Sequence, residues 1–145
     1  ACSSFIKEPK DYEITNIRDV ITALPKVMVP QMRQLYTNLH TQHCGIPLCI
    51  SKGKSIISEH ALSQSVALSP DAFPEISIDY PTAIAYLQGE AIVLPPDSPK
   101  GTVLICYNGY RLGFCKNLGT RANNNYPKEW RIRNKTIPAD PIVIL

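Results

Sequence analysis

The stretch that most constrains the fold of this 145-residue chain is TVLICYNGYRLGFCKN, at residues 102–117. Two apolar runs rich in β-branched and aromatic residues flank an Asn-Gly pair at 108–109. Asn and Gly tolerate the positive φ angles of a tight hairpin turn, so this pattern is the strongest short-range signal for a β-hairpin. We therefore expect an antiparallel strand pair here, and with it a sheet.

Several other segments have strand patterns, because they are short, rich in apolar or β-branched residues and bounded by turn residues. They lie at 19–25, on both sides of a Lys-Gly-Lys turn at 52–54, at 75–80, at 91–96 and at 142–145. Residues 1–18 are polar and lack a clear periodicity. We expect them to form a lead-in segment.

Three short helices are predicted between these strands. Apolar residues recur at spacings of three and four between Pro30 and His40, which indicates an amphipathic helix. They are Met32, Leu35, Tyr36 and Leu39. A second helix is predicted with Ser58 as its N-cap, and a third over 81–90, where a proline begins it and a glycine ends it. The whole pattern predicts an α+β domain built on a twisted sheet or a partly closed barrel.

Charge is distributed unevenly along the chain, although the net charge is only +3. Residues 1–99 hold seven lysines and arginines against ten acids, whereas residues 100–137 hold eight against Glu129 alone. Such an asymmetry favours an anionic partner for residues 100–137, with nucleic acid as the first candidate and a membrane surface as the second. No apolar run of about 18 residues occurs, so no membrane span is predicted.

Residues 100–137 also contain aromatic and amide side chains. Lysines and arginines neutralise phosphates, Tyr126 and Trp130 could stack on unpaired bases, and Asn125 could hydrogen-bond RNA or brace its loop. The alternative is architectural, with both aromatic rings in the core and the Asn-Tyr-Pro stretch setting a turn. The candidate RNA-binding residues are Lys52, Lys54, Lys116, Arg121, Asn125, Tyr126, Lys128, Trp130, Arg131 and Arg133.

Five cysteines and three histidines raise the question of catalysis or metal binding. An odd number of cysteines without a CxxC motif argues against a disulfide framework and against a zinc ribbon. A cysteine nucleophile would need Cys44 or Cys49 beside His43 or His60, and proximity in sequence does not define such a pair. No phosphate-cradling glycine loop occurs either. The residues therefore favour a binding module, with no metal site and no catalytic residues predicted.

Three segments, in order, resemble one known family. They are GIPLCISKGKSIISEHALSQSVAL at 45–68, AIAYLQGEAI at 83–92 and LICYNGYRLGFCKNLGTRANNNYPKEWRIR at 104–133. They are similar to the C-terminal region of the bacterial ribosomal RNA small subunit methyltransferase F family, in the Nol–Nop–Sun group of RNA cytosine-5 methyltransferases. The matching positions are Gly45, Lys52, Gly53, His60 and Leu62 upstream, and Gly109, Leu112, Gly113, Lys116, Asn125, Tyr126, Pro127, Lys128 and Arg131 in the last segment.

The resemblance implies a PUA-like RNA-binding fold, a mixed β-barrel or sheet with short helices, over residues 76–145. It implies a companion α+β subdomain at 19–75, cytoplasmic small-subunit ribosomal RNA as the partner, and a catalytic methyltransferase domain in the same polypeptide. The family's S-adenosylmethionine site and its catalytic cysteine motifs do not occur in these residues, so the methyl donor is expected to bind only that domain. The alternative is a protein-interaction module whose basic face meets an acidic partner or the parent catalytic domain.

Overall fold

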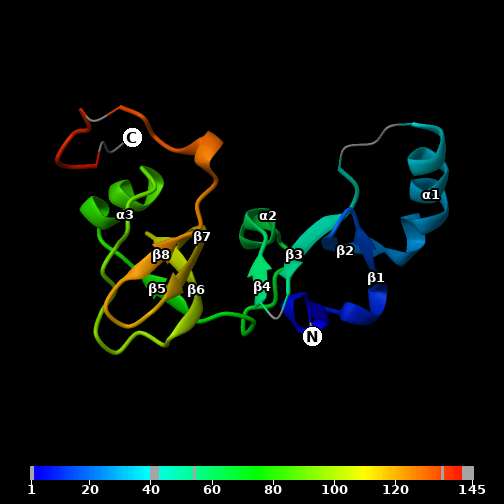
Figure 1. Ribbon diagram of the computed structural model, residues 1–145, viewed down its shortest axis with the longest axis horizontal. Coiled ribbons are helices and arrows are strands. Elements are labelled where there is room, and N and C mark those ends of the chain that lie inside the picture. The colour runs from blue at the N-terminus through cyan, green and yellow to red at the C-terminus, as the bar shows by residue number, and fades with distance from the viewer. Residues whose placement is uncertain (1, 40–42, 54, 135, 142–145) are drawn as a thin grey trace. The chain divides into compact units, whose positions relative to one another are not determined.

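The computed structural model describes residues 2–39, 43–53, 55–134 and 136–141. The chain divides into two compact units, unit 1 at residues 1–72 and unit 2 at residues 73–145. Each unit contains one four-stranded sheet (Figure 1). Two small sheets with a few short helices make an α+β fold, as predicted. No helix in the described part of the chain has both the length and the apolarity to cross a membrane.

Unit 1 is built on an antiparallel sheet in the strand order β1-β2-β3-β4. Its strands are β1 (Tyr12–Ile17), β2 (Val20–Pro25), β3 (Ile46–Lys52) and β4 (Ser55–Ser58), its α-helices are α1 (Val29–Asn38) and α2 (His60–Gln64), and its 3-10 helices are η1 (Cys2–Phe5), η2 (Pro9–Asp11) and η3 (Lys26–Met28). The buried core draws on β2, β3 and α2 through Leu24, Leu48 and Leu62. The strands predicted around the turn at 52–54 and at 19–25 are confirmed.

Strand β1 lies inside the segment that the sequence predicts as a lead-in. It pairs with β2 along its whole length, from Tyr12 opposite Pro25 to Ile17 opposite Val20. Polar residues interrupt its alternation, and the turn that joins the two strands has no glycine. Arg18 and Asp19 adopt φ angles of 51° and 68° instead, which few residues other than glycine do. A hairpin without the usual turn residues gives little signal in the sequence.

The second helix of unit 1 begins later than predicted. Ser58 is the last residue of β4, where it pairs with Cys49 of β3. Glu59 takes the N-cap position of α2 and makes no side-chain capping hydrogen bond. The sheet ladder therefore holds the residue predicted as the cap, and the prediction of Ser58 as N-cap was wrong.

Unit 2 has a mixed sheet in the order β5-β6-β7-β8, with β5 parallel to β6 and the other pairs antiparallel. Its elements are β5 (Glu75–Ser77), α3 (Tyr80–Leu87), β6 (Gly101–Tyr107), β7 (Tyr110–Asn117), β8 (Ala122–Asn124) and the 3-10 helix η4 (Lys128–Trp130). Strands β6 and β7 form the predicted hairpin, with Asn108 and Gly109 at φ angles of 47° and 78°. Val103 to Cys106 are buried without interruption, because both faces of this central strand are covered.

Helix α3 contributes the largest fully buried side chain of unit 2, that of Tyr86. The Tyr86 hydroxyl donates to the carbonyl oxygen of Phe114 at 3.1 Å, so the ring is buried with its polar end satisfied. The core cluster consists of Tyr86, Ile92, Leu94, Val103, Ile105, Cys115 and Ala122. The helix starts at the cap Asp79, whose carboxylate accepts from the Thr82 amide, and ends before Gly89 at a φ of 83°.

Two strand predictions in unit 2 need correction. Residues 91–96 form no strand. Only Ile92 pairs, as an isolated bridge to Ala122, and Pro95 and Pro96 have no amide hydrogen to extend it. The strand predicted at 75–80 ends at Ser77, because Asp79 already caps α3. The strand predicted at 142–145 lies outside the described residues.

Candidate nucleic-acid interface

Six of the eight predicted site residues of unit 2 lie on the chain that follows β8, and this chain runs along the C-terminal end of α3. The Ile132 amide donates to the Leu87 carbonyl at 3.0 Å, and the side-chain amide of Gln88 donates to the Asn134 carbonyl at 3.2 Å. The last carbonyls of a helix have no partner within the helix, so these contacts satisfy one of them and fix the segment there. We call residues 125–134 the basic segment.

Asn124 fastens the start of the basic segment. Its side-chain nitrogen donates to the carbonyl oxygens of Tyr86 at 2.7 Å and of Glu90 at 2.9 Å. Its side-chain oxygen accepts from the Tyr126 amide at 2.8 Å. The neighbouring Asn125 was the residue predicted to bind RNA or brace the loop. It is exposed, and its backbone amide donates to the Phe114 carbonyl at 3.3 Å. Three consecutive asparagines gave no signal that the middle one is the structural residue.

Arg131 lies across the end of α3 rather than pointing freely into solvent. It is half-buried, and its guanidinium donates to the Tyr126 carbonyl at 3.3 Å. The guanidinium also covers Gly89, where any added Cβ would overlap it. Glycine is therefore required at position 89 for two reasons: the backbone has a positive φ, and the Arg131 guanidinium approaches the Cα closely. This placement gives Arg131 an architectural part, whatever it contacts besides.

The two aromatic candidates of the segment differ in their surroundings. The ring of Tyr126 packs edge-on against Tyr86, with centroids 5.5 Å apart, and contributes to the core cluster. Trp130 exposes 58% of its surface in η4. The sequence left two hypotheses open for both rings, packing in the core and stacking on RNA bases. Packing describes Tyr126, whereas the ring of Trp130 is more than half exposed.

Lys128 and Arg133 are exposed and line a groove of about 610 Å³ at the end of α3. The groove lining is completed by Gln88, Glu90, Arg131 and Ile132. Cations at a helix C-terminus meet the negative end of the helix dipole, an arrangement worth roughly 0.3–1 kcal/mol each at exposed sites. Within the described residues the ion pairs are Lys10–Glu8, Arg33–Glu13 and Arg111–Glu75. None of them uses a cation of this groove.

The remaining candidate residues lie outside the groove. Lys116 is exposed on β7, opposite Asn123 of β8, and Arg121 is exposed just before β8. Lys52 is exposed at the end of β3 in unit 1, and Lys54 lies outside the described residues. The structure thus brings together Lys128, Arg131 and Arg133 and places the other cations elsewhere.

Counting charge by unit changes the picture drawn from the linear sequence. Unit 2 has eight lysines and arginines, all after residue 99, and six acids, four of them before it. The fold mixes the two groups: Arg111 pairs with Glu75 at 3.1 Å, and Glu90 lines the same groove as Lys128. The basic excess is therefore local to the groove and not a property of the whole unit.

Two of the residues considered for nucleophilic catalysis, Cys49 and His60, are both shifted by burial toward their uncharged forms. Cys49 is fully buried, and burial with a hydrogen bond to Cys2 raises its pKa to about 12, so it stays a thiol at neutral pH. Burial lowers the pKa of His60, which keeps its imidazole neutral. Among the described residues no group of three or more His, Cys, Asp or Glu side chains could hold a metal ion.

Comparison with known proteins places unit 2 in a family. Residues 73–132 match the model described as the methyltransferase RsmF PUA domain. This match begins where unit 2 begins and ends within the basic segment.

Three curated relatives, all described as ribosomal RNA small subunit methyltransferase F, extend the similarity. The chain is 30% identical to the Shewanella woodyi protein over 110 residues and 28% identical to the Shewanella loihica protein over 111 residues. It is 34% identical to the Shewanella baltica protein over 92 residues. These matches cover 75%, 76% and 61% of this chain but only 22%, 22% and 19% of the relatives, so the chain spans about a fifth of their length.

Proposed function

We propose that this chain, which belongs to the RsmF methyltransferase family through its PUA domain, is the RNA-binding part of a methyltransferase that acts on small-subunit ribosomal RNA. The groove at the end of α3 would bind the RNA backbone. The observation that carries the proposal is the trio Lys128, Arg131 and Arg133 on this one groove, where none has an ion-pair partner among the described residues.

The roles of the groove residues follow from their surroundings. Lys128 and Arg133 are exposed and would pair with phosphates, releasing counterions as they do so. Trp130 offers a ring face for an unpaired base, a contact worth about 1–3 kcal/mol. Arg131 and Asn124 would hold the segment in place from within. Lys116, Arg121 and Asn125 are exposed on the same unit and would extend the contact area.

The proposal separates recognition from chemistry. The relatives' names describe methyltransferases, and most of each relative's length lies outside the match. We assign the S-adenosylmethionine site and the methyl transfer to that remaining portion. The present residues would position the RNA, in the cytoplasm where ribosomal RNA is found.

Fluorescence anisotropy with a labelled small-subunit ribosomal RNA fragment, titrated at several salt concentrations, tests the proposal. Log–log plots of affinity against salt should have a slope of about −0.7 to −0.9 for each phosphate contact. Charge reversal at Lys128→Glu and Arg133→Glu should weaken binding and make the slope shallower by roughly 1.5. Trp130→Ala should weaken binding without changing the slope, because stacking releases no counterions.

A matched control is available in unit 1. Lys10→Glu with Lys26→Glu makes the same change in net charge at exposed positions away from the groove. This double variant should leave the slope unchanged. Equal effects of the two double variants would mean that net charge, and not the groove, drives the binding. An absence of RNA binding at low salt, with retained binding to an acidic protein or to the parent catalytic domain, would favour the protein-interaction alternative.

A further inference from the structure

Helix α1 of unit 1 has an apolar surface that its own unit leaves open. Of its ten residues only Val29 is buried. Large apolar side chains on and beside the helix are exposed instead, namely Val27, Met28, Leu35, Tyr36 and Leu39. A helix of this length is marginal in water without tertiary packing, and here the packing within the unit is slight. An exposed apolar patch of this kind marks an interaction surface.

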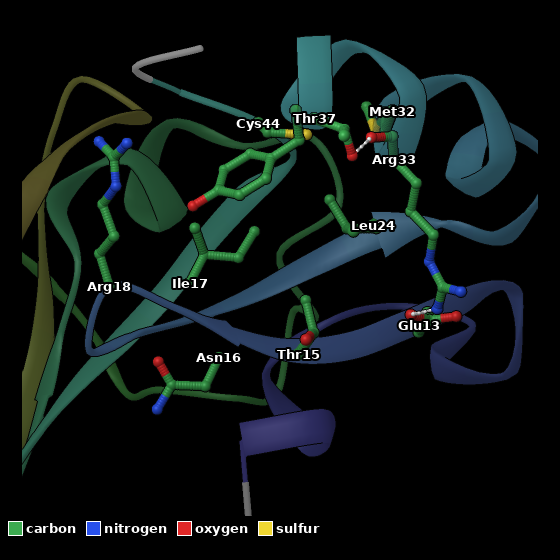
Figure 2. A pocket seen from close by; sticks show the side chains of 11 residues that line it. Glu13, Thr15, Asn16, Ile17, Arg18, Leu24, Met32, Arg33, Thr37 and Cys44 are labelled. Atoms are coloured by element: carbon green, nitrogen blue, oxygen red, sulfur yellow. Dashed lines mark hydrogen bonds and ion pairs between the residues drawn. The ribbon is translucent and has the colours of Figure 1, made fainter. Parts of the chain in front are cut away.

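A groove beside α1 continues this surface. It has a volume of about 390 Å³ and lies between α1 and β1, with Ile17, Leu24, Met32 and Tyr36 in its lining. Figure 2 shows Arg18 and Arg33 on opposite sides of the groove, with Ile17 and Leu24 between them. Arg33 is held by Glu13 through an ion pair of 2.9 Å. An apolar floor with the Arg18 cation on one side and the Arg33–Glu13 ion pair on the other suits a protein segment with apolar and polar side chains.

The occupant is indicated by the portion of the relatives that lies outside the match. Unit 2 has too few residues to account for matches of 110 residues, so the similarity extends into unit 1. More than three quarters of the length of these relatives lies outside the match. Interfaces between domains of one polypeptide resemble those between transient protein partners, and an exposed apolar patch marks such an interface. We propose that the α1 surface is the docking face for the catalytic portion of the same methyltransferase polypeptide.

This inference rests on the proposed function in one respect, that the chain is part of a methyltransferase. It adds a division of labour between the units. Unit 2 presents cations at the end of α3, whereas unit 1 presents an apolar helix. The first surface suits a polyanion and the second a protein.

Hydrogen–deuterium exchange tests the docking face. The amides of residues 29–38 should exchange at least tenfold more slowly in the full-length polypeptide that contains this chain than in the 145-residue chain alone. Leu35→Glu with Leu39→Glu, introduced into the full-length protein, should return this exchange to the rate of the isolated chain. A charged pair on the apolar face opposes docking, because each carboxylate would have to be desolvated.

The matched control places two glutamates on exposed apolar positions elsewhere. Val66→Glu and Val93→Glu, at residues exposed by 90% and 77%, should leave the protection of α1 intact. Equal exchange of α1 in the isolated and the full-length protein would overturn the proposal. A dimer of the isolated chain in sedimentation velocity, abolished by the Leu35 and Leu39 variants, would overturn it in favour of a second copy.

Failure of this proposal is distinguishable from failure of the RNA proposal. The RNA titration uses the 145-residue chain alone, and the Leu35 and Leu39 double variant should bind RNA there with unchanged affinity. Loss of RNA binding in this variant would instead assign the α1 surface to RNA, and would overturn the docking proposal.

Discussion

Helices α1 and α3 are built alike and used differently. Both are short, and both carry a proline in the first turn. Helix α3 places Tyr86 in the core of unit 2 with its hydroxyl satisfied. Helix α1 leaves Leu35 and Leu39 half exposed or more, at 50% and 57%. The same periodicity therefore marks an apolar face in both helices, and only the surroundings decide whether the chain itself covers that face.

The two helices differ in how far residues of their own unit cover them. In unit 2 the end of α3 is closed by its own chain, through Asn124, Gln88 and the amide of Ile132. In unit 1 the exposed ion pair between Arg33 and Glu13 is, among the described residues, the one side-chain hydrogen bond between α1 and the sheet. An exposed pair of this kind is worth roughly 0–1 kcal/mol. Unit 2 thus covers the end of its own helix, whereas unit 1 leaves one face of α1 exposed.

The largest expected effect sharpens this contrast directly. Tyr86→Ala should lower the free energy of unfolding of unit 2 by about 3–5 kcal/mol, because it leaves a cavity and removes the hydrogen bond from the Tyr86 hydroxyl to the Phe114 carbonyl. Leu35→Ala should change the stability of unit 1 by less than about 0.5 kcal/mol in the 145-residue chain. Urea unfolding, followed by the backbone amide NMR signals of each unit, measures both. A cost of several kcal/mol for Leu35→Ala would mean that α1 is already packed, and the comparison would fail.

Sequence reasoning recovered the elements whose local signals agree with their tertiary setting. The Asn108-Gly109 hairpin, helix α3 and the strand pair β3 and β4 all combine a hydrophobic pattern with the residues that their backbone geometry needs. The basic segment was recognised for the same reason, since Lys128, Arg131 and Arg133 are close in sequence as well as in space.

What escaped sequence reasoning depends on contacts between distant residues. Strand β1 is defined by pairing with β2 across a turn without glycine, and β8 by pairing of Ala122–Asn124 with β7. The part played by Asn124 requires the carbonyls of Tyr86 and Glu90, more than thirty residues away. The sequence predicted that Gly89 ends the helix. It did not predict that a side chain at this position would overlap the guanidinium of Arg131. Such demands come from the fold and leave no local pattern.

A smaller effect separates the two neighbouring asparagines. Asn124→Ala should cost about 1–3 kcal/mol, because the Glu90 carbonyl and the Tyr126 amide lose their bonds to Asn124 and the Tyr86 carbonyl keeps only its bond from the Gly89 amide. Asn125→Ala, at an exposed residue, should cost less than about 0.5 kcal/mol. Amide exchange over residues 126–134 reports the difference, and only the Asn124 variant should accelerate it. Equal acceleration by both would mean that the basic segment is fastened elsewhere.

The smallest effect concerns the response of unit 2 to alkaline pH. Burial raises the pKa of the Cys115 thiol from 9.0 to about 12 and also raises the pKa values of Cys106 and Tyr86. Between pH 9 and 12 the unfolded chain releases the Cys115 proton while the folded unit keeps it. The stability of unit 2 should therefore fall as pH rises, by about 1.4 kcal/mol per pH unit for this thiol.

Urea unfolding of unit 2 at about pH 8.5, 9.5 and 10.5 measures the slope across the lower part of this window. Cys115→Ala should make the slope shallower even where the lost side chain lowers stability at every pH, because alanine has no proton to release. Cys44→Ala, in unit 1, should leave the slope of unit 2 unchanged. Unit 1 should respond to alkali through Cys49, whose pKa burial also raises to about 12.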